Sequence, residues 1–467
     1  MADVIVWEDD PGSALGSIQV PAPDLSRPPL PLRITNPDQE PAAKLYDKGT
    51  PEFRYWGAAG ALSRAATYWG ALIPEGTSWQ PGPPLPVILD GGEDLNAFYD
   101  RRALNFFHGQ GADGNLVFSG ESPDVVCHEL GHGVLDALRP ELFNAMSLEI
   151  PAFHESFADM SAILTALQVS RVRDAVLRET GGHIDHASSL SRLAEQLGAA
   201  IRAQAPDAVD PDCLRNAANS LFYQDPENLP SSAPASTIAQ EPHSFSRVFT
   251  GAFLEALAGM LLAVSPNPSS ADLLNVSNSM GRLLVAAVQS APAVPEFYSQ
   301  VAAALVQADA QDGGRFAVPL KSAFVRRGIL SPHAATAVGS LGRAVMAAPA
   351  MAAAITARGR VNELPLQAID GAQYGLGSIP LFVHVPTQPR TVTALAAGPG
   401  GGAVSPPSSD RAARVFVEHL MRLGRVDFGP HAGPGTLVHP RARKTHMVER
   451  LDGGALVLRR RLFYCWG

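Results

Sequence analysis

The chain has 467 residues, of which 46% are hydrophobic and 17% are charged, and its formal net charge is −9. This balance is typical of a globular protein with room for two or three domains, and it excludes a disordered or coiled-coil chain. The acidic balance gives no electrostatic footprint for nucleic acid or for an acidic membrane surface, so we expect neither partner.

The predicted elements follow one another with few interruptions. Residues 1–45 are rich in proline and predict an extended arm or packed loops. Apolar residues that recur at intervals of three and four predict helices, and short apolar runs that end at glycine predict strands. The predicted strands and turns are 84–90 and 96–110, and the predicted helices are 52–72, 124–140, 149–169, 244–264 and 295–311.

The carboxyl-terminal third contains a predicted linker followed by further predicted elements. A tract of Gly, Pro and Ser at 396–410 predicts a linker, and 413–426 predicts an amphipathic helix. Residues 445–464 predict a β-hairpin that turns at Asp452-Gly453-Gly454.

Three features of the sequence bear on localisation: the N-terminal residues, the longest apolar stretch and the cysteines. The first residues show no basic start followed by a long apolar run, which a secretory signal requires. The most apolar stretch, 251–264, is too short to span a bilayer. Three cysteines do not predict a disulfide framework. We expect a cytoplasmic protein by default, although export without a signal peptide would leave no mark on the sequence.

The segment DVVCHELGHGVLDALRP (124–140) contains an HExxH pattern. His128 and His132 are four residues apart, so on a helix they share a face and can offer two imidazole nitrogens to one metal ion. Glu129 lies about 100° round the helix, which suits a base that acts on a metal-bound water. The alternative is an amphipathic helix with polar residues at its edge, because so short a pattern also arises by chance.

A catalytic zinc ion needs a third protein ligand. The segment FHESFADM (153–160) offers Glu155 for that role and Asp159, four residues on, to accept the spare N–H of a ligating histidine. Taken alone, each is an ordinary acid near a helix start. Their position 23 residues after His132 favours the metal centre, whereas His154 is expected to be structural or solvated.

Together, HELGH and ESFAD resemble the HExxH and ExxxD motifs of the thermolysin-like zinc metallopeptidases. The resemblance implies that His128, His132 and Glu155 hold one catalytic zinc ion. It also implies that Glu129 is the general base and that Asp159 orients a ligand.

Other segments extend this resemblance over about 45–331. NAFYD (96–100) resembles the family's edge strand, which implies that Asn96 and Ala97 bind an extended peptide. The segments 214–230 and 241–253 resemble those that carry an active-site arginine, here Arg215, and an oxyanion-stabilising histidine, here His243. Residues 298–330 resemble the family's closing helices.

The substrate pocket is implied by the same likeness. Val125 and Leu214 would line the pocket for the residue that follows the cut bond. An apolar residue would then be favoured there, with a broad preference.

The fold implied is α+β and two-lobed, with a mixed N-terminal lobe and a mainly helical C-terminal lobe. We divide the chain into an N-terminal arm (1–45), a peptidase domain (46–331) and a C-terminal extension (332–467). We recognise no resemblance to a known family in the extension. Three roles remain open for it: it could bind an unknown partner, cover the cleft or mediate assembly.

Three departures from the family pattern bear on activity. No tyrosine lies between Gly133 and Glu155, where the family has one that donates to the oxyanion. Asp124 matches one calcium ligand, but 160–173 lacks the other acids, so calcium binding is doubtful. Only about 45 residues precede the match, so we expect neither the family's signal nor its propeptide.

We therefore predict a zinc-dependent endopeptidase that cuts peptides or proteins on the N-terminal side of apolar residues. The alternative is a zinc-binding protein of the same fold that has weak or no proteolytic activity and serves in binding or assembly.

Overall fold

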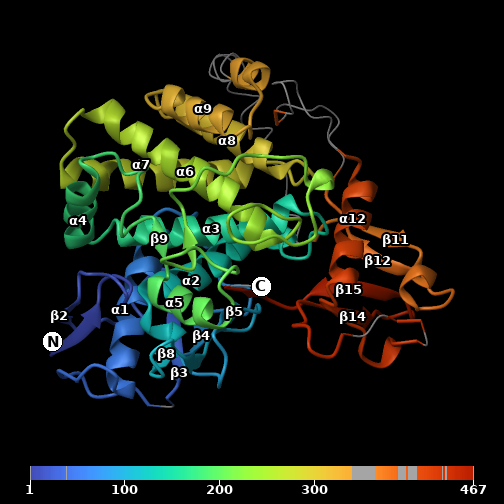
Figure 1. The fold of residues 1–467 in the computed structure, drawn as a ribbon, viewed down its shortest axis with the longest axis horizontal. Coiled ribbons are helices and arrows are strands. Elements are labelled where there is room, and N and C mark those ends of the chain that lie inside the picture. The colour runs from blue at the N-terminus through green and yellow to red at the C-terminus, as the bar shows by residue number, and fades with distance from the viewer. Residues whose placement is uncertain are drawn as a thin grey trace.

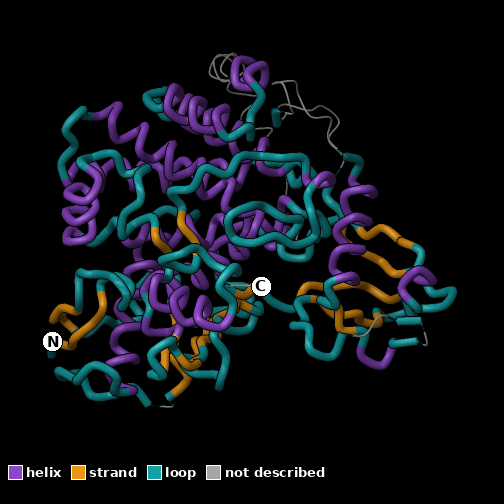
Figure 2. The backbone as a smooth tube through the Cα atoms, in the orientation of Figure 1, coloured by secondary structure: helices purple, strands orange, loops and turns teal. Residues whose placement is uncertain are grey.

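The computed structural model describes residues 2–37, 39–338, 363–387, 396–397, 407–433, 435–436 and 439–465, and all structural statements concern these residues. The protein is an α+β structure with a mostly helical middle (Figures 1 and 2). The α-helices are α1 Pro51–Gly70, α2 Pro123–Leu138, α3 Glu149–Ala166, α4 Ser170–Thr180, α5 Glu195–Gln204, α6 Pro242–Val264, α7 Ser270–Ser290, α8 Phe297–Gln311, α9 Ala317–Arg326 and α12 Ser409–Arg422. The strands are β1 Asp3–Trp7, β2 Ser17–Pro21, β3 Leu32–Asn36, β4 Leu85–Ile88, β5 Ala97–Tyr99, β6 Leu104–Phe106, β7 His108–Gln110, β8 Leu116–Phe118, β9 Arg192–Leu193, β10 Arg215–Asn216, β11 Leu366–Ile369, β12 Leu381–His384, β13 Val426–Asp427, β14 His446–Arg450, β15 Leu456–Arg460 and β16 Phe463–Tyr464.

The N-terminal residues contribute to two sheets. Strands β1 and β2 pair antiparallel, and β3 belongs to a five-stranded sheet of order β16-β5-β6-β4-β3. Residues 1–45, for which the sequence indicates an arm or packed loops, thus supply strands to the fold. The helix predicted at 52–72 is α1, and the segment predicted as strands and turns at 96–110 forms β5, β6 and β7.

Helices α2 and α3 form the buried centre of the molecule. Every residue of both helices is buried. They pack on each other, and α3 also packs on α6, which in turn packs on α7 and α9. An ideal Cβ atom at Gly131 of α2 would lie 2.8 Å from Cα of Ala158 in α3, so glycine permits this close approach.

The ends of α2 are set by its sequence. The hydroxyl of Ser122 caps the helix by accepting from the backbone N–H of Val125, and Pro123 occupies the first turn. The helix ends at Leu138, two residues before Pro140. The capped start fixes the residue at which α2 begins.

The C-terminal region forms a separate five-stranded sheet of order β11-β12-β15-β14-β13, accompanied by α12 (Figure 1). The predicted hairpin is confirmed for β14 and β15, which pair antiparallel around Gly453 and Gly454, both with positive φ. The prediction of a hairpin up to 464 is wrong at its end, because Phe463–Tyr464 pairs with β5 in the other five-stranded sheet. Most of the predicted linker at 396–410 lies outside the described residues.

By length and composition alone, one helix of the described residues, α6, could cross a membrane, because the helix extends well before the 251–264 stretch that was predicted to be too short. Most of it is buried within the protein, as in the core helix of a globular domain.

Candidate metal centre

The predicted zinc ligands come together at the contact between α2 and α3. The Nε2 atom of His128 lies 3.5 Å from Oε2 of Glu155, and Nε2 of His132 lies 3.6 Å from the same oxygen. One ligand atom from each of these residues falls within 4.8 Å of the others, and all three residues are buried. The i, i+4 spacing on α2 and the facing position on α3 produce this cluster.

These ligand atoms have no hydrogen bonds within the described part of the chain. The unpartnered atoms are Nε2 of His128, both ring nitrogens of His132 and Oε2 of Glu155. Leaving a buried polar group unpaired costs on the order of 1–3 kcal/mol, and more for a charged one. A metal ion that accepts these lone pairs would remove that cost, so the donor set fits zinc.

Asp159, one turn after Glu155 on α3, positions the first ligand. Its Oδ1 atom accepts from Nδ1 of His128 at 3.0 Å, which leaves Nε2 of that ring free for a metal. The same oxygen accepts from Nη2 of Arg215 at 2.8 Å. Burial alone would raise the pKa of Asp159, but the charge of Arg215 and the hydrogen bond from His128 hold it below the ordinary value.

Glu129 lies beside the predicted ligands, and one of its carboxylate oxygens is within 4.8 Å of ligand atoms of His128 and Cys465. Both of its carboxylate oxygens are buried and accept no hydrogen bond from the described residues. Burial raises its pKa to about 8. A carboxylate whose pKa is close to neutral pH can take up and release a proton, which is the property that a general base needs.

His243, in the first turn of α6, reaches the same place from the other side. Its Nδ1 atom bonds to Glu241 at 2.7 Å, and its Nε2 atom lies 3.5 Å from Oε2 of Glu155. Burial alone would lower the pKa of His243, but the charges of Glu155 and Glu241 raise it to about 9. The protonated ring can therefore donate from both nitrogens.

The residues that were predicted to bind substrate have less defined positions relative to the metal cluster. Asn96 is buried just before β5, and its Oδ1 atom accepts from the N–H of Ala97. Val125 is buried in the first turn of α2, and Leu214 is buried next to Arg215, with its N–H bonded to Leu193. The pocket that they are predicted to line stays a prediction.

Two other predictions concern neighbouring residues. His154 is fully buried, and its ring stacks on Phe463 with centroids 4.3 Å apart, so its role is packing. Among the described residues, Asp124 belongs to neither cluster of side chains that could hold a metal ion. One of its carboxylate oxygens accepts from the N–H of Ala194 instead. Calcium binding stays a prediction.

The last described residues also belong to the site, although the sequence did not predict this. The backbone carbonyl of Tyr464 accepts from Nε2 of His243, and that of Cys465 accepts from Nη1 of Arg215, each at 2.5 Å. The N–H of Cys465 donates to the carbonyl of Ala97 at 2.9 Å. Because β5 was predicted to bind an extended peptide, some segment could be expected along this strand. No local pattern in 463–465 identifies these residues as that segment.

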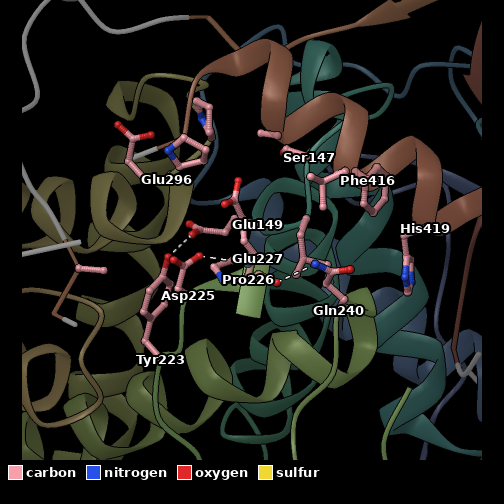
Figure 3. A pocket seen from close by; sticks show the side chains of 16 residues that line it. Ser147, Glu149, Tyr223, Asp225, Pro226, Glu227, Gln240, Glu296, Phe416 and His419 are labelled. Atoms are coloured by element: carbon pink, nitrogen blue, oxygen red, sulfur yellow. Dashed lines mark hydrogen bonds between the residues drawn. The ribbon is translucent and has the colours of Figure 1, made fainter. Parts of the chain in front are cut away.

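A cavity is lined by residues other than those of the metal cluster. Its lining includes Glu149 at the start of α3, Tyr223, Asp225, Pro226, Glu227, Glu296, and Phe416 and His419 of α12 (Figure 3). Burial raises the pKa of Glu149 to about 8, and the hydroxyl of Tyr223 donates to it at 2.7 Å. Residues predicted for the metal centre do not line this cavity.

Comparison with known proteins leaves the family open: no protein-family model matches the chain, and no curated protein matches it. Functional conclusions therefore rest on the residues and their geometry.

Proposed function

We propose that this protein is a zinc-dependent endopeptidase with the two-lobed thermolysin-like fold over residues 46–331. The observation that carries the proposal is the buried set of His128, His132 and Glu155, whose facing ligand atoms accept and donate no hydrogen bond within the described residues. Glu129 beside the set argues for catalysis, because a structural zinc ion has no use for a buried general base. We further propose a peptide or protein substrate, no nucleic-acid or membrane partner, and the cytoplasm as the compartment.

Each residue has a separable role in peptide hydrolysis. A zinc ion held by His128, His132 and Glu155 would lower the pKa of a bound water and polarise the scissile carbonyl. Glu129 accepts the proton of the attacking water and passes it to the leaving amine. His243 donates a hydrogen bond to the carbonyl oxygen as negative charge develops there.

The substrate would lie as an extended strand along β5. Main-chain hydrogen bonds to Ala97, and a hydrogen bond from Arg215 to a substrate carbonyl, would hold peptides of many sequences. Val125 and Leu214 would contribute the apolar pocket for the residue after the cut. One methylene in such a pocket is worth roughly 1–3 kcal/mol, so the preference would be graded.

The test is a mixed peptide library whose cuts are mapped by mass spectrometry. We expect cuts before apolar residues that disappear with a zinc chelator and in Glu129→Gln. The matched control is Glu75→Gln, which changes an exposed glutamate and should cut as wild type does. Cuts that persist in Glu129→Gln would refute the assigned base, and cuts that persist with chelator would refute the metal.

A second candidate function is a zinc-binding protein that has lost proteolysis and serves in binding or assembly. Two observations favour it: β16 already pairs with β5, and no tyrosine lies between Gly133 and Glu155. One bound zinc ion without any cut peptide, also after β16 has been displaced, would decide for this candidate.

A further inference from the structure

The strand β16 lies where the proposed function needs a substrate. Phe463 pairs with Tyr99 and Tyr464 pairs with Phe98, antiparallel, on the outer side of β5. In Figure 1 the C-terminal end leaves the C-terminal sheet and enters the main body of the molecule, where β5 lies. This chain therefore adds its own strand to the edge that was predicted to bind peptides.

Two side chains of the site bind consecutive carbonyls of this segment. His243 donates to the carbonyl of Tyr464, and Arg215 donates to the carbonyl of Cys465, both at 2.5 Å. The N–H between these carbonyls, that of Cys465, is bonded to Ala97 at 2.9 Å. Every polar backbone atom from the carbonyl of Tyr464 to that of Cys465 thus has a partner from the site.

The side chains of the segment fit the same surroundings. The ring of Phe463 stacks on that of His132, with centroids 4.9 Å apart and an interplanar angle of 14°. The ring of Tyr464 stacks on that of His243 at 5.7 Å. All three residues from Phe463 to Cys465 are buried.

The bond between Tyr464 and Cys465 is the one placed beside the catalytic groups. Its carbonyl oxygen is bonded to His243, whose Nε2 atom is 3.5 Å from the ligand Glu155. The Sγ atom of Cys465, the residue after this bond, lies within 4.8 Å of ligand atoms of His128 and Glu129.

We propose that this protein cleaves its own chain between Tyr464 and Cys465, an inference that rests on the proposed function. One water molecule is consumed as the C–N bond breaks. Its oxygen and the carbonyl form the carboxylate of Tyr464, and both of its protons end on the new amine of Cys465, which leaves as an ammonium group. The cut releases Cys465, whose hydrogen bonds to Ala97 and Arg215 help to hold β16 on β5, so processing weakens the hold of β16 on this edge.

The first experiment follows the intact mass of the full chain after zinc is added to chelator-stripped protein. We expect wild type to lose the residues from Cys465 onward at a rate independent of protein concentration, because the substrate is intramolecular. Glu129→Gln should keep its full mass. Wild type that keeps its full mass overturns the inference.

Two substitutions of one residue provide a matched pair. Cys465→Ala keeps the backbone N–H that bonds to Ala97 and a small apolar side chain after the cut bond, and it should still be processed. Cys465→Pro removes that N–H, and it should be processed at least 10-fold more slowly, a loss that about 1.4 kcal/mol in the barrier would produce. Equal rates for the two variants overturn the inference.

A spectroscopic measurement tests the competing role for this cysteine, which is ligation of the metal by its thiolate. The Glu129→Gln protein, loaded with Co²⁺ in place of zinc, should show no sulfur-to-cobalt charge-transfer band. A band that vanishes when Cys465→Ser is added would overturn the inference, because the segment would then be a metal-bound inhibitor.

Failure of the inference can be told apart from failure of the proposed function by adding library peptides in excess. Library cuts by a chain that keeps its own C-terminal residues overturn self-processing and leave the peptidase intact. Absence of both kinds of cut overturns both.

Discussion

Asp159 holds His128 through a hydrogen bond of 3.0 Å between Oδ1 and Nδ1, on the side of the ring opposite Nε2, the nitrogen that lies 3.5 Å from Glu155. Asn at this position would keep the size of the side chain but lose its charge. Loss of such an orienting carboxylate lowers metal affinity by about 10–100-fold. We expect Asp159→Asn to show this loss in competition with a chelator.

The same change leaves Arg215 buried without its carboxylate, so a drop in the free energy of unfolding should accompany it. Asp174→Asn, an exposed change on α4, is the control and should leave zinc affinity unchanged. Unaltered zinc affinity in Asp159→Asn would contradict the assigned role of that carboxylate.

His243→Gln should separate catalysis from metal binding. The variant loses a positively charged donor to the scissile carbonyl oxygen but none of the zinc ligands. Removing one such donor costs about 10²–10³ in kcat. We expect that loss in steady-state kinetics on a library-derived peptide, with zinc content unchanged.

The control for this prediction is His333→Gln, which replaces an exposed histidine. If His243→Gln retained full kcat, the oxyanion would have to be stabilised elsewhere.

Gly131→Ala tests the contact between α2 and α3. Its Cβ atom would meet Cα of Ala158 and Cβ of Ser161, each at 2.8 Å, and would push apart the helices that carry the ligands. Overpacking of this kind costs about 1–3 kcal/mol, so we expect a lower midpoint of urea unfolding and weaker zinc binding.

Gly133→Ala is the matched change on the same helix. Its Cβ atom meets its nearest neighbour, Cζ3 of Trp79, at 3.4 Å, so it fits without a clash. Alanine is favoured over glycine in a helix by about 1 kcal/mol. Stability should therefore stay the same or rise, and equal losses in the two variants would refute the packing argument.

Stability should depend on pH through Glu149, away from the metal. Its pKa is about 8 in the folded protein, because burial disfavours the carboxylate, whereas the ordinary pKa of a glutamate is 4.5. The folded state thus holds the extra proton between these values, and the contribution of Glu149 to stability falls as pH rises from about 4.5 towards 8. Each unit of pKa difference corresponds to about 1.4 kcal/mol.

Glu149→Gln removes this titration. We expect the difference in free energy of unfolding, variant minus wild type, to increase from about pH 5 to about pH 8 in urea titrations. Glu75→Gln, at an exposed position, should show no such trend. A difference that does not change with pH would contradict the raised pKa of Glu149.

Local patterns in the sequence were enough to place the metal cluster. The i, i+4 spacing of His128 and His132 and the cap at Ser122 determine which face of α2 carries the histidines. Glu155 and Asp159 follow from the same periodicity on α3. These relationships span one or two turns of a helix, so the chain need not be folded for them to be recognised.

Long-range pairing could not be predicted in the same way. β16 is two residues long, and its partner β5 lies more than 300 residues earlier, so no alternation of apolar residues identifies the pair. The N-terminal strand β3 was missed because a proline-rich composition indicates loops, whereas its parallel partner β4 stabilises it in the sheet. Arg215 and His243 were predicted from a resemblance, since their types alone are common on surfaces.

The connection between β15 and β16 couples two parts of the molecule mechanically. Only Arg461 and Leu462 separate the last strand of the C-terminal hairpin from the strand on β5. An extended residue spans about 3.5 Å, so this connection has almost no slack. A force that shifts the C-terminal sheet outward would be transmitted along the backbone and would separate Tyr464 from Phe98. Movement of the C-terminal sheet would therefore control whether β16 stays paired with β5.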